Sequence, residues 1–190
     1  MNFNYGEKFN LEDLSLQRLR IYTYPSPILK KIALPIRTFD ADLSEFIEKM
    51  IQTMYHSRGI GLAAPQVGCS IRLFISDTSF EFDDENDSIV LNANPKAYIN
   101  PKIIKKEGEI LNEEGCLSFP GIYEKVKRFE KISMQYQDVK GQEKIINATG
   151  LESICLQHEL DHLNGIVFIE KLSPLKQSFL KKKFLKSKKK

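Results

Sequence analysis

The chain has 190 residues, of which 42% are hydrophobic and 28% charged, a composition typical of one globular domain with its own core. No apolar run approaches the roughly 18 residues of a membrane span, and the first residues lack a signal or transit pattern, so we expect a cytoplasmic protein without membrane contact. Nine of the 28 basic side chains and none of the 25 acidic ones lie in residues 171–190, so a mildly acidic body precedes a basic tail.

The first predicted elements follow a polar extension, residues 1–18. Apolar residues recur at helical spacing over 42–57, which predicts an amphipathic helix capped by Asp40 or Asp42. Small residues over 59–68 predict a loop, residues 71–76 a strand, and residues 77–88 an irregular loop that carries an acidic insert at 81–87. Alternating patterns and turn signals predict short strands between 97 and 146.

A second strong helix is predicted from Thr149, because Thr149 and Glu152 have the spacing of a capping box and Asn164-Gly165 is a typical helix end. We expect a short strand over 166–169 and a lysine-rich helix from Pro174. This order predicts an α+β fold, with short antiparallel strands around a central helix and a further helix at the C-terminus.

Two of the chain's three histidines lie in one stretch, His158-Glu159-Leu160-Asp161-His162. Positions i and i+4 share a helix face, so both imidazoles can bind one metal ion. Glu159 is then placed to take a proton from a water molecule that the metal activates. Histidines that only pack or cap the helix are the structural alternative. The shortage of other histidines favours a metal-binding role for this central helix.

A catalytic site of this kind requires a third protein ligand. One metalloprotease class takes a histidine six positions after the second, but Phe168 stands there. Another takes a glutamate from a later helix, but Glu170 is the only acidic residue after His162. His56, at the end of the first helix, stays open as a ligand.

Three cysteines cannot all pair with one another, and in a reducing compartment we expect free thiols or ligands. Cys69 has the context of a core thiol. Cys155 lies too far from the second histidine along the same helix to share its ion, so we expect it to pack beside the site. Cys116 follows Gly115 in a stretch where the backbone can bend sharply. The provisional ligands are Cys116, His158 and His162.

Three stretches together resemble the signature motifs of the peptide deformylase family, in the family's order. They are Gly59-Ile60-Gly61-Leu62-Ala63-Ala64-Pro65-Gln66, Glu114-Gly115-Cys116-Leu117-Ser118 and Gln157-His158-Glu159-Leu160-Asp161-His162. The likeness covers about residues 19–172, and the basic C-terminal helix is similar to that of the helix-ended, bacterial-type subclass. The resemblance implies removal of the formyl group from the N-terminal formylmethionine of nascent chains, with release of formate.

The resemblance also implies roles for individual residues. Glu159 is the general acid and base, and the oxyanion is bound by the Gln66 amide and the Leu117 backbone N–H. One divalent ion is held by Cys116, His158 and His162; it is iron(II) in the cell, with zinc(II), nickel(II) or cobalt(II) as substitutes.

The implied substrate contacts include a backbone edge and a methionine pocket, whose apolar members also fit ordinary core packing. They are Gly59, Ile60, Gly61, Gly115, Leu151, Ile154 and Cys155. Glu114 and Arg128 are expected to form a charge pair that braces the Cys116 loop, and Asp161 to orient a ligand.

We thus expect an extension at 1–18, a catalytic deformylase domain at 19–172 and a basic helix or tail at 173–190. The expected partners are formylated nascent peptides and, through the lysines of the tail, ribosomal RNA phosphates, with the protein itself a monomer. Two alternatives remain open. One is a metallopeptidase that cuts ordinary peptide bonds, and the other is a ribosome-associated binding protein with a vestigial metal site.

Overall fold

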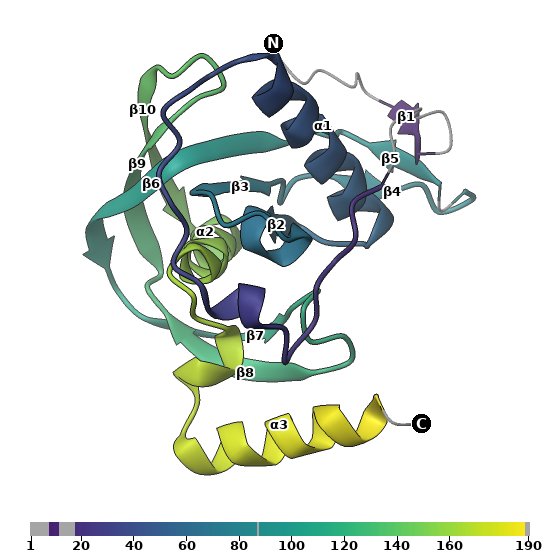
Figure 1. Cartoon of the computed structure of the whole chain (residues 1–190), viewed down its shortest axis with the longest axis vertical. Helices are drawn as coiled ribbons and strands as arrows, with labels where there is room; N and C mark the ends of the chain where they lie inside the picture. The colour runs from purple at the N-terminus through teal and green to yellow at the C-terminus, as the bar shows by residue number, and fades with distance from the viewer. Residues whose placement is uncertain (1–7, 12–17, 87, 189–190) are drawn as a thin grey trace.

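A computed structural model of the chain describes residues 8–11, 18–86 and 88–188. Its main sheet has five antiparallel strands in the order β10-β9-β6-β3-β2. These strands are β2 (Gly61–Ala63), β3 (Leu73–Ser76), β6 (Lys96–Glu107), β9 (Lys131–Gln137) and β10 (Glu143–Thr149). The sheet curves around helix α2 (Gly150–Leu163), which is seen nearly end-on in Figure 1.

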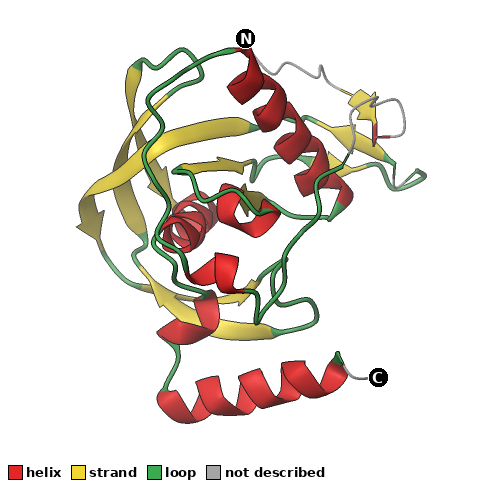
Figure 2. Cartoon of the chain, viewed as in Figure 1, coloured by secondary structure: helices red, strands yellow, loops and turns green. Residues whose placement is uncertain are grey.

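Two smaller antiparallel sheets complete the described strands. The hairpin of β7 (Ile110–Gly115) and β8 (Tyr123–Arg128) closes the structure beneath α2 (Figure 2). The other sheet has the order β1-β5-β4, with β1 at Lys8–Asn10, β4 at Glu81–Phe82 and β5 at Ile89–Leu91. The predicted α+β class with antiparallel strands around a central helix is confirmed.

Helix α1 (Ala41–His56) forms where the helical spacing predicted it. Asp40 is the N-cap, and its side chain accepts a hydrogen bond from the Leu43 backbone N–H. The apolar face buries Ile47 and Met50 in a cluster shared with strands β2 and β3. Because α1 ends just before Gly59, this packing fixes where the glycine loop enters the site.

Helix α2 lies inside the molecule rather than on its surface, since ten of its 14 residues are buried. Several of the buried side chains are polar, and buried polar groups need partners or a ligand. Asn164 and Gly165, the latter at φ +70°, end the helix as predicted. Thr149 makes no side-chain capping bond, so the predicted capping box is wrong at that point.

Three further sequence predictions are wrong in detail. Residues 59–68 are not a continuous loop, because they form β2 and the 3-10 helix η3 (Ala64–Val67). Residues 77–88 are not wholly irregular, because β4 pairs with β5. Residues 166–169 do not form a strand; the chain turns into a 3-10 helix, η4 (Phe168–Lys171), where the Glu170 N–H bonds to the Val167 carbonyl at 2.8 Å. Packing of Phe168 and Ile169 into a core favours the turn over an extended chain.

Helix α3 (Pro174–Ser187) confirms the predicted C-terminal helix. Leu180 and Phe184 are buried against Phe119, whose ring centroid lies 5.1 Å from that of Phe184. No helix in the described ranges is long and apolar enough to cross a membrane. Short 3-10 turns at η2 (Pro27–Lys30) and η3 (Ala64–Val67) complete the fold.

The N-terminal extension contributes to the core over its described part. Leu11 is buried in the same cluster as α1, and its N–H bonds to the Ser88 carbonyl at 2.7 Å. Residues 1–7 and 12–17 of this extension lie outside the described ranges. The division into extension, catalytic domain and tail stays a prediction.

Candidate metal centre and substrate pocket

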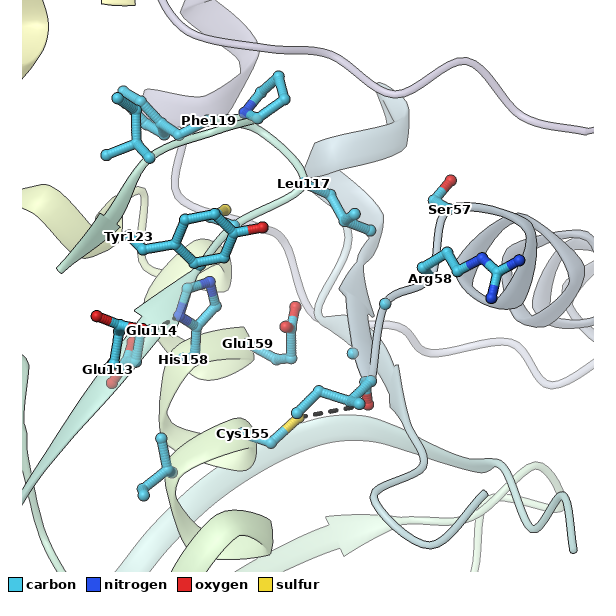
Figure 3. A pocket seen from close by; sticks show the side chains of 18 of the residues that line it. Ser57, Arg58, Glu113, Glu114, Leu117, Phe119, Tyr123, Cys155, His158 and Glu159 are labelled. Carbon is cyan, nitrogen blue, oxygen red and sulfur yellow. Dashed lines mark hydrogen bonds and ion pairs between the residues drawn. The ribbon is translucent and has the colours of Figure 1, made fainter. Parts of the chain in front are cut away.

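A cavity of about 420 Å³ opens between α2, the loop after α1 and the β7–β8 hairpin. Figure 3 shows Cys155, His158 and Glu159 projecting into it from α2, with Leu117 and Tyr123 on other walls. All sequence-predicted substrate contacts line this cavity: Gly59, Ile60, Gly61, Gly115, Leu151, Ile154 and Cys155. The structure therefore brings three distant motifs to one cavity.

Three side chains offer ligand atoms that all lie within 4.8 Å of one another: Cys116, His158 and His162. The Cys116 Sγ is 3.3 Å from the His162 Nε2. The two imidazoles lie one helical turn apart, with ring centroids 5.1 Å apart. His56, the alternative ligand, instead contacts the Gln52 carbonyl on its own helix.

The residues at this point fit a bound cation. Burial, with nearby His158 and Arg128, holds the pKa of His162 well below its ordinary value, so the imidazole is neutral, the form that binds metals. The Glu159 Oε2 is buried and has no hydrogen-bond partner among the described residues. Buried polar groups that converge on one point cost free energy unless a bound ligand compensates for their lost hydration. A thiolate with two imidazoles suits iron(II) or zinc(II).

Glu114 and Arg128 form the expected charge pair. Arg128 donates from Nε and Nη2 to the two Glu114 oxygens at 2.7 and 2.9 Å, and Glu114 also contacts the His158 Nδ1 at 2.8 Å. Burial alone would raise the pKa of Glu114, but hydrogen bonds from Arg128 and His158 outweigh it and lower the pKa to about 2. A carboxylate on Nδ1 fixes the tautomer and leaves His158 Nε2 as its ligand atom.

The brace extends further than the sequence indicated. Arg128 Nη1 donates to Asp161 Oδ2, and Lys171 Nζ lies 3.0 Å from Asp161 Oδ1. Lys171 belongs to η4, so the chain of polar contacts runs from His158 on α2 through Glu114, Arg128 and Asp161 to η4. Asp161 thus contacts Arg128 and Lys171, and its expected role in orienting a ligand stays a prediction.

Glu159 lies against the glycine edge of the cavity. Burial raises the pKa of its carboxyl group to about 7. A Cβ on Gly61 would come within 2.5 Å of Glu159 Oε1 and 2.9 Å of Cys155 Sγ. Gly61 is therefore required for close approach of strand β2 to this carboxylate.

Gln66 enters from η3 and is 1% exposed. Its Nε2 lies 3.6 Å from Cys116 Sγ, so the amide faces the ligand cluster. Leu117 follows Cys116 directly and lines the same cavity, and its Cδ1 would be 2.9 Å from a Cβ on Gly59. Both sequence-predicted oxyanion donors thus belong to residues at the cavity.

Sequence reasoning missed several residues of the cavity. Tyr123 on β8 is 65% exposed although aromatic, and its ring would meet a Cβ on Gly115 at 2.6 Å. Asn112 and Glu113 from β7, and Arg58 after α1, also line the cavity. The sequence pattern did not single out Tyr123, because its direction is set by the pairing of β7 with β8.

A cysteine, two histidines on one helix and a buried glutamate beside them form the arrangement of a mononuclear metal-dependent hydrolase. The family model described as polypeptide deformylase matches residues 18–178. The chain belongs to the polypeptide deformylase family, hydrolases that remove the formyl group from the N-terminus of polypeptides. The family and the reaction expected from the three motifs are confirmed.

Relatives and solved structures agree with this assignment. The chain is 46% identical to a peptide deformylase of Chromobacterium violaceum over 90% of this chain and 96% of the relative. It is 48% identical to a peptide deformylase of Thermodesulfovibrio yellowstonii over 87% of this chain and 96% of the relative. The crystal structure of a peptide deformylase from Legionella pneumophila superimposes with a TM-score of 0.81 at 40% identity, covering 91% of this chain and 96% of that one.

A further similar structure is a peptide deformylase from Synechococcus elongatus in complex with actinonin. Its TM-score is 0.79 at 35% identity, with 92% of this chain and 91% of that chain covered. Coverage is high on both sides, so the likeness extends over the whole catalytic region and not over one motif.

Proposed function

We propose that Glu159 is the proton carrier in removal of the formyl group from N-terminal formylmethionine, with one divalent ion held by Cys116, His158 and His162. The observation that carries the proposal is the Glu159 Oε2. It is buried, has no hydrogen-bond partner among the described residues, and belongs to the residue that follows His158. A carboxylate so held is available for proton transfer.

When bound, the ion supplies Lewis acidity that lowers the pKa of water and polarises the formyl carbonyl. We propose iron(II) as the cellular ion, with zinc(II), nickel(II) or cobalt(II) able to replace it, because one thiolate and two imidazoles suit these metals. Metal analysis of protein purified without oxygen tests this. Zinc alone in such a preparation would contradict iron(II).

Glu159 takes a proton from the attacking water at Oε2 and returns it to the departing amine. The Gln66 Nε2–H and the Leu117 backbone N–H donate hydrogen bonds to the formyl oxygen as negative charge develops on it. Removing one such donor costs on the order of 10²–10³ in kcat. The Glu114–Arg128 pair acts at one remove, since it holds His158 in one tautomer and orientation.

The methionine side chain occupies the apolar part of the cavity formed by Ile60, Leu151, Ile154 and Cys155, of which Ile154 and Cys155 are each 4% exposed. The peptide backbone pairs with the edge from Gly59 to Gly61, beside Gly115. This mode reads the backbone, so the residues after methionine are selected weakly.

The test compares formyl-Met, acetyl-Met and unmodified peptides of the same sequence. We expect release of formate only from the first, and no cleavage of internal peptide bonds. Glu159→Ala keeps the metal and loses turnover. Glu152→Ala is the matched control on the same helix, because Glu152 contacts Lys96 at 3.9 Å rather than the site. Equal cleavage of acetyl and formyl peptides would contradict deformylation.

We further propose that α3 docks this protein, as a monomer of the cytoplasm, on the ribosome during synthesis of its substrates. Leu180 and Phe184 are buried and form the inner face of α3. Lys182, Lys183 and Lys186 are exposed, and α3 contains no acidic residue that could pair with them. Lysines arranged in this way neutralise RNA phosphates. Residues 189–190, which are also lysines, lie outside the described ranges.

Replacing Lys182, Lys183 and Lys186 by Gln leaves the buried face intact, which truncation of α3 would not. We expect weaker ribosome binding and a salt dependence reduced by about one unit of slope per lysine. Lys102→Gln with Lys105→Gln on β6 is the control. Unchanged or salt-insensitive binding would rule the surface out, and sedimentation of the free protein tests the monomer.

A further inference from the structure

The Gln66 side-chain amide is held at both ends by groups of opposite hydrogen-bonding polarity. Its Oε1 accepts from the Ala63 backbone N–H at 2.8 Å. Its Nε2 donates to the Ser118 Oγ at 3.2 Å. Gln66 and Ser118 are 1% and 0% exposed, so bulk water does not replace either contact. The orientation of the amide is therefore set by these two partners.

The direction of the Ser118 hydroxyl follows from its second contact. Ser118 Oγ donates to the Tyr22 backbone carbonyl at 2.9 Å, and a carbonyl can only accept. A hydroxyl has one hydrogen, so towards Gln66 the Ser118 oxygen presents only lone pairs. A flipped Gln66 amide would set its oxygen against those lone pairs and its N–H groups against the Ala63 N–H. Both ends thus select the same orientation.

The Tyr22 carbonyl is itself fixed relative to both motif loops. Tyr22 N–H donates to the Gln66 carbonyl at 2.7 Å, and Tyr24 N–H donates to the Ser118 carbonyl at 3.0 Å. The segment 22–24 therefore joins the glycine loop to the Cys116 loop through the backbone. Because these bonds do not involve the Ser118 hydroxyl, the segment remains tied to both loops when that hydroxyl is removed.

We propose that Ser118 is a positioning residue whose hydroxyl orients the Gln66 amide so that an Nε2–H faces the substrate carbonyl oxygen. This rests on the oxyanion role proposed for Gln66. An amide nitrogen carries two hydrogens. One is directed at Ser118, and the other is on the side where Cys116 Sγ lies 3.6 Å away, which is the side of the ligand cluster. Figure 3 shows Leu117 and Phe119, the two neighbours of Ser118 in the chain, on the loop that borders the cavity.

The chain contains a chemically matched control on α2. Ser153 Oγ donates to the Phe129 carbonyl at 3.0 Å and accepts from Gln157 Nε2 at 3.1 Å, and Ser153 is also 0% exposed. Gln157 does not line the cavity. Ser153→Ala therefore removes an equivalent buried hydroxyl between a carbonyl and a glutamine without touching the proposed oxyanion donor.

The experiment measures kcat and KM for a formyl-Met peptide, metal content and thermal stability in a double-mutant cycle. Ser118→Ala should lower kcat on the order of tenfold, less than the roughly 10²–10³ for an oxyanion donor that is removed outright, with KM nearly unchanged. It should cause no further loss in a Gln66→Ala background. Ser153→Ala should leave kcat unchanged at a similar stability loss. Ser118→Cys fills the same space with a weaker hydrogen-bonding group and should give a smaller loss than alanine.

The outcomes distinguish failure of the oxyanion role of Gln66 from failure of the positioning role of Ser118. If Gln66→Ala leaves kcat unchanged, the proposed oxyanion role fails and the role of Ser118 fails with it. If Gln66→Ala lowers kcat but Ser118→Ala does not, only the role of Ser118 fails. A Ser118→Ala loss that persists in the Gln66→Ala background, or that Ser153→Ala reproduces, shows a structural hydroxyl and overturns the proposal.

Discussion

Replacing Gly61 by Ala should reduce turnover without unfolding the protein. The Gly61 backbone is not in the left-handed region, so alanine meets no dihedral penalty there. The obstacle is steric, because the new Cβ would lie 2.5 Å from Glu159 Oε1. Ordinary van der Waals contact begins at 3.4 Å, so the carboxylate has to move by about 0.9 Å.

A displacement of about 1 Å in a catalytic group lowers the rate by roughly 10²-fold, and we expect a loss of kcat of that order. Overpacking of a buried methyl costs about 1–3 kcal/mol in unfolding free energy. The metal should be retained, since the atoms nearest to the new methyl belong to Glu159 and Cys155 and not to the three proposed ligands. The loss should therefore appear in kcat and not in metal content.

The assay follows formate release at saturating formyl-Met peptide, with metal content and urea unfolding measured on the same sample. Ile75→Val on the neighbouring strand β3 is the control, because it costs about 0.5–1.5 kcal/mol without reaching Glu159. Near-normal kcat in Gly61→Ala would refute the reasoning that this glycine makes room for the carboxylate. An equal loss of kcat in Ile75→Val would assign the effect to general destabilisation.

Three other changes test the remaining parts of the structure. Cys116→Ala should lower the affinity for the metal by more than the roughly 10–100-fold that is lost when a residue hydrogen-bonded to a ligand is replaced. Competition with a chelator measures this affinity, and stoichiometric metal in the variant would contradict the role of Cys116 as a ligand. Arg128→Ala removes the cation that Glu114 and Asp161 share, so we expect a loss of about 3–5 kcal/mol in unfolding free energy together with weaker metal binding, whereas unchanged activity and metal affinity would count against the brace. Phe184→Ala should cost about 3–5 kcal/mol in unfolding free energy and expose the backbone of α3 to hydrogen exchange. Phe179 is 65% exposed, so Phe179→Ala is the neutral control. Equal protection in both variants would show that α3 does not depend on the contact of Phe184.

Local patterns were sufficient for the helices and for most of the central sheet. The α1 spacing, the cap at Asp40 and the end at Gly165 depend on neighbours within a few positions, so they could be predicted without the fold. The turn into η4 could not, because residues 166–169 are apolar enough for a strand. Their backbone is decided by the core into which Phe168 packs.

The sequence by itself was enough to predict which residues could hold a metal ion. His158 and His162 share a face because helical geometry alone puts them there. Cys116 was predicted as the third ligand because the positions that supply this ligand in the other metalloprotease classes hold no suitable residue. Tertiary structure decided how these residues are held: Arg128 reaches Asp161 as well as Glu114, and Tyr22 orients the Ser118 hydroxyl. Such contacts join segments dozens of residues apart, and their hydrogen-bond directions exist only once packing has excluded water.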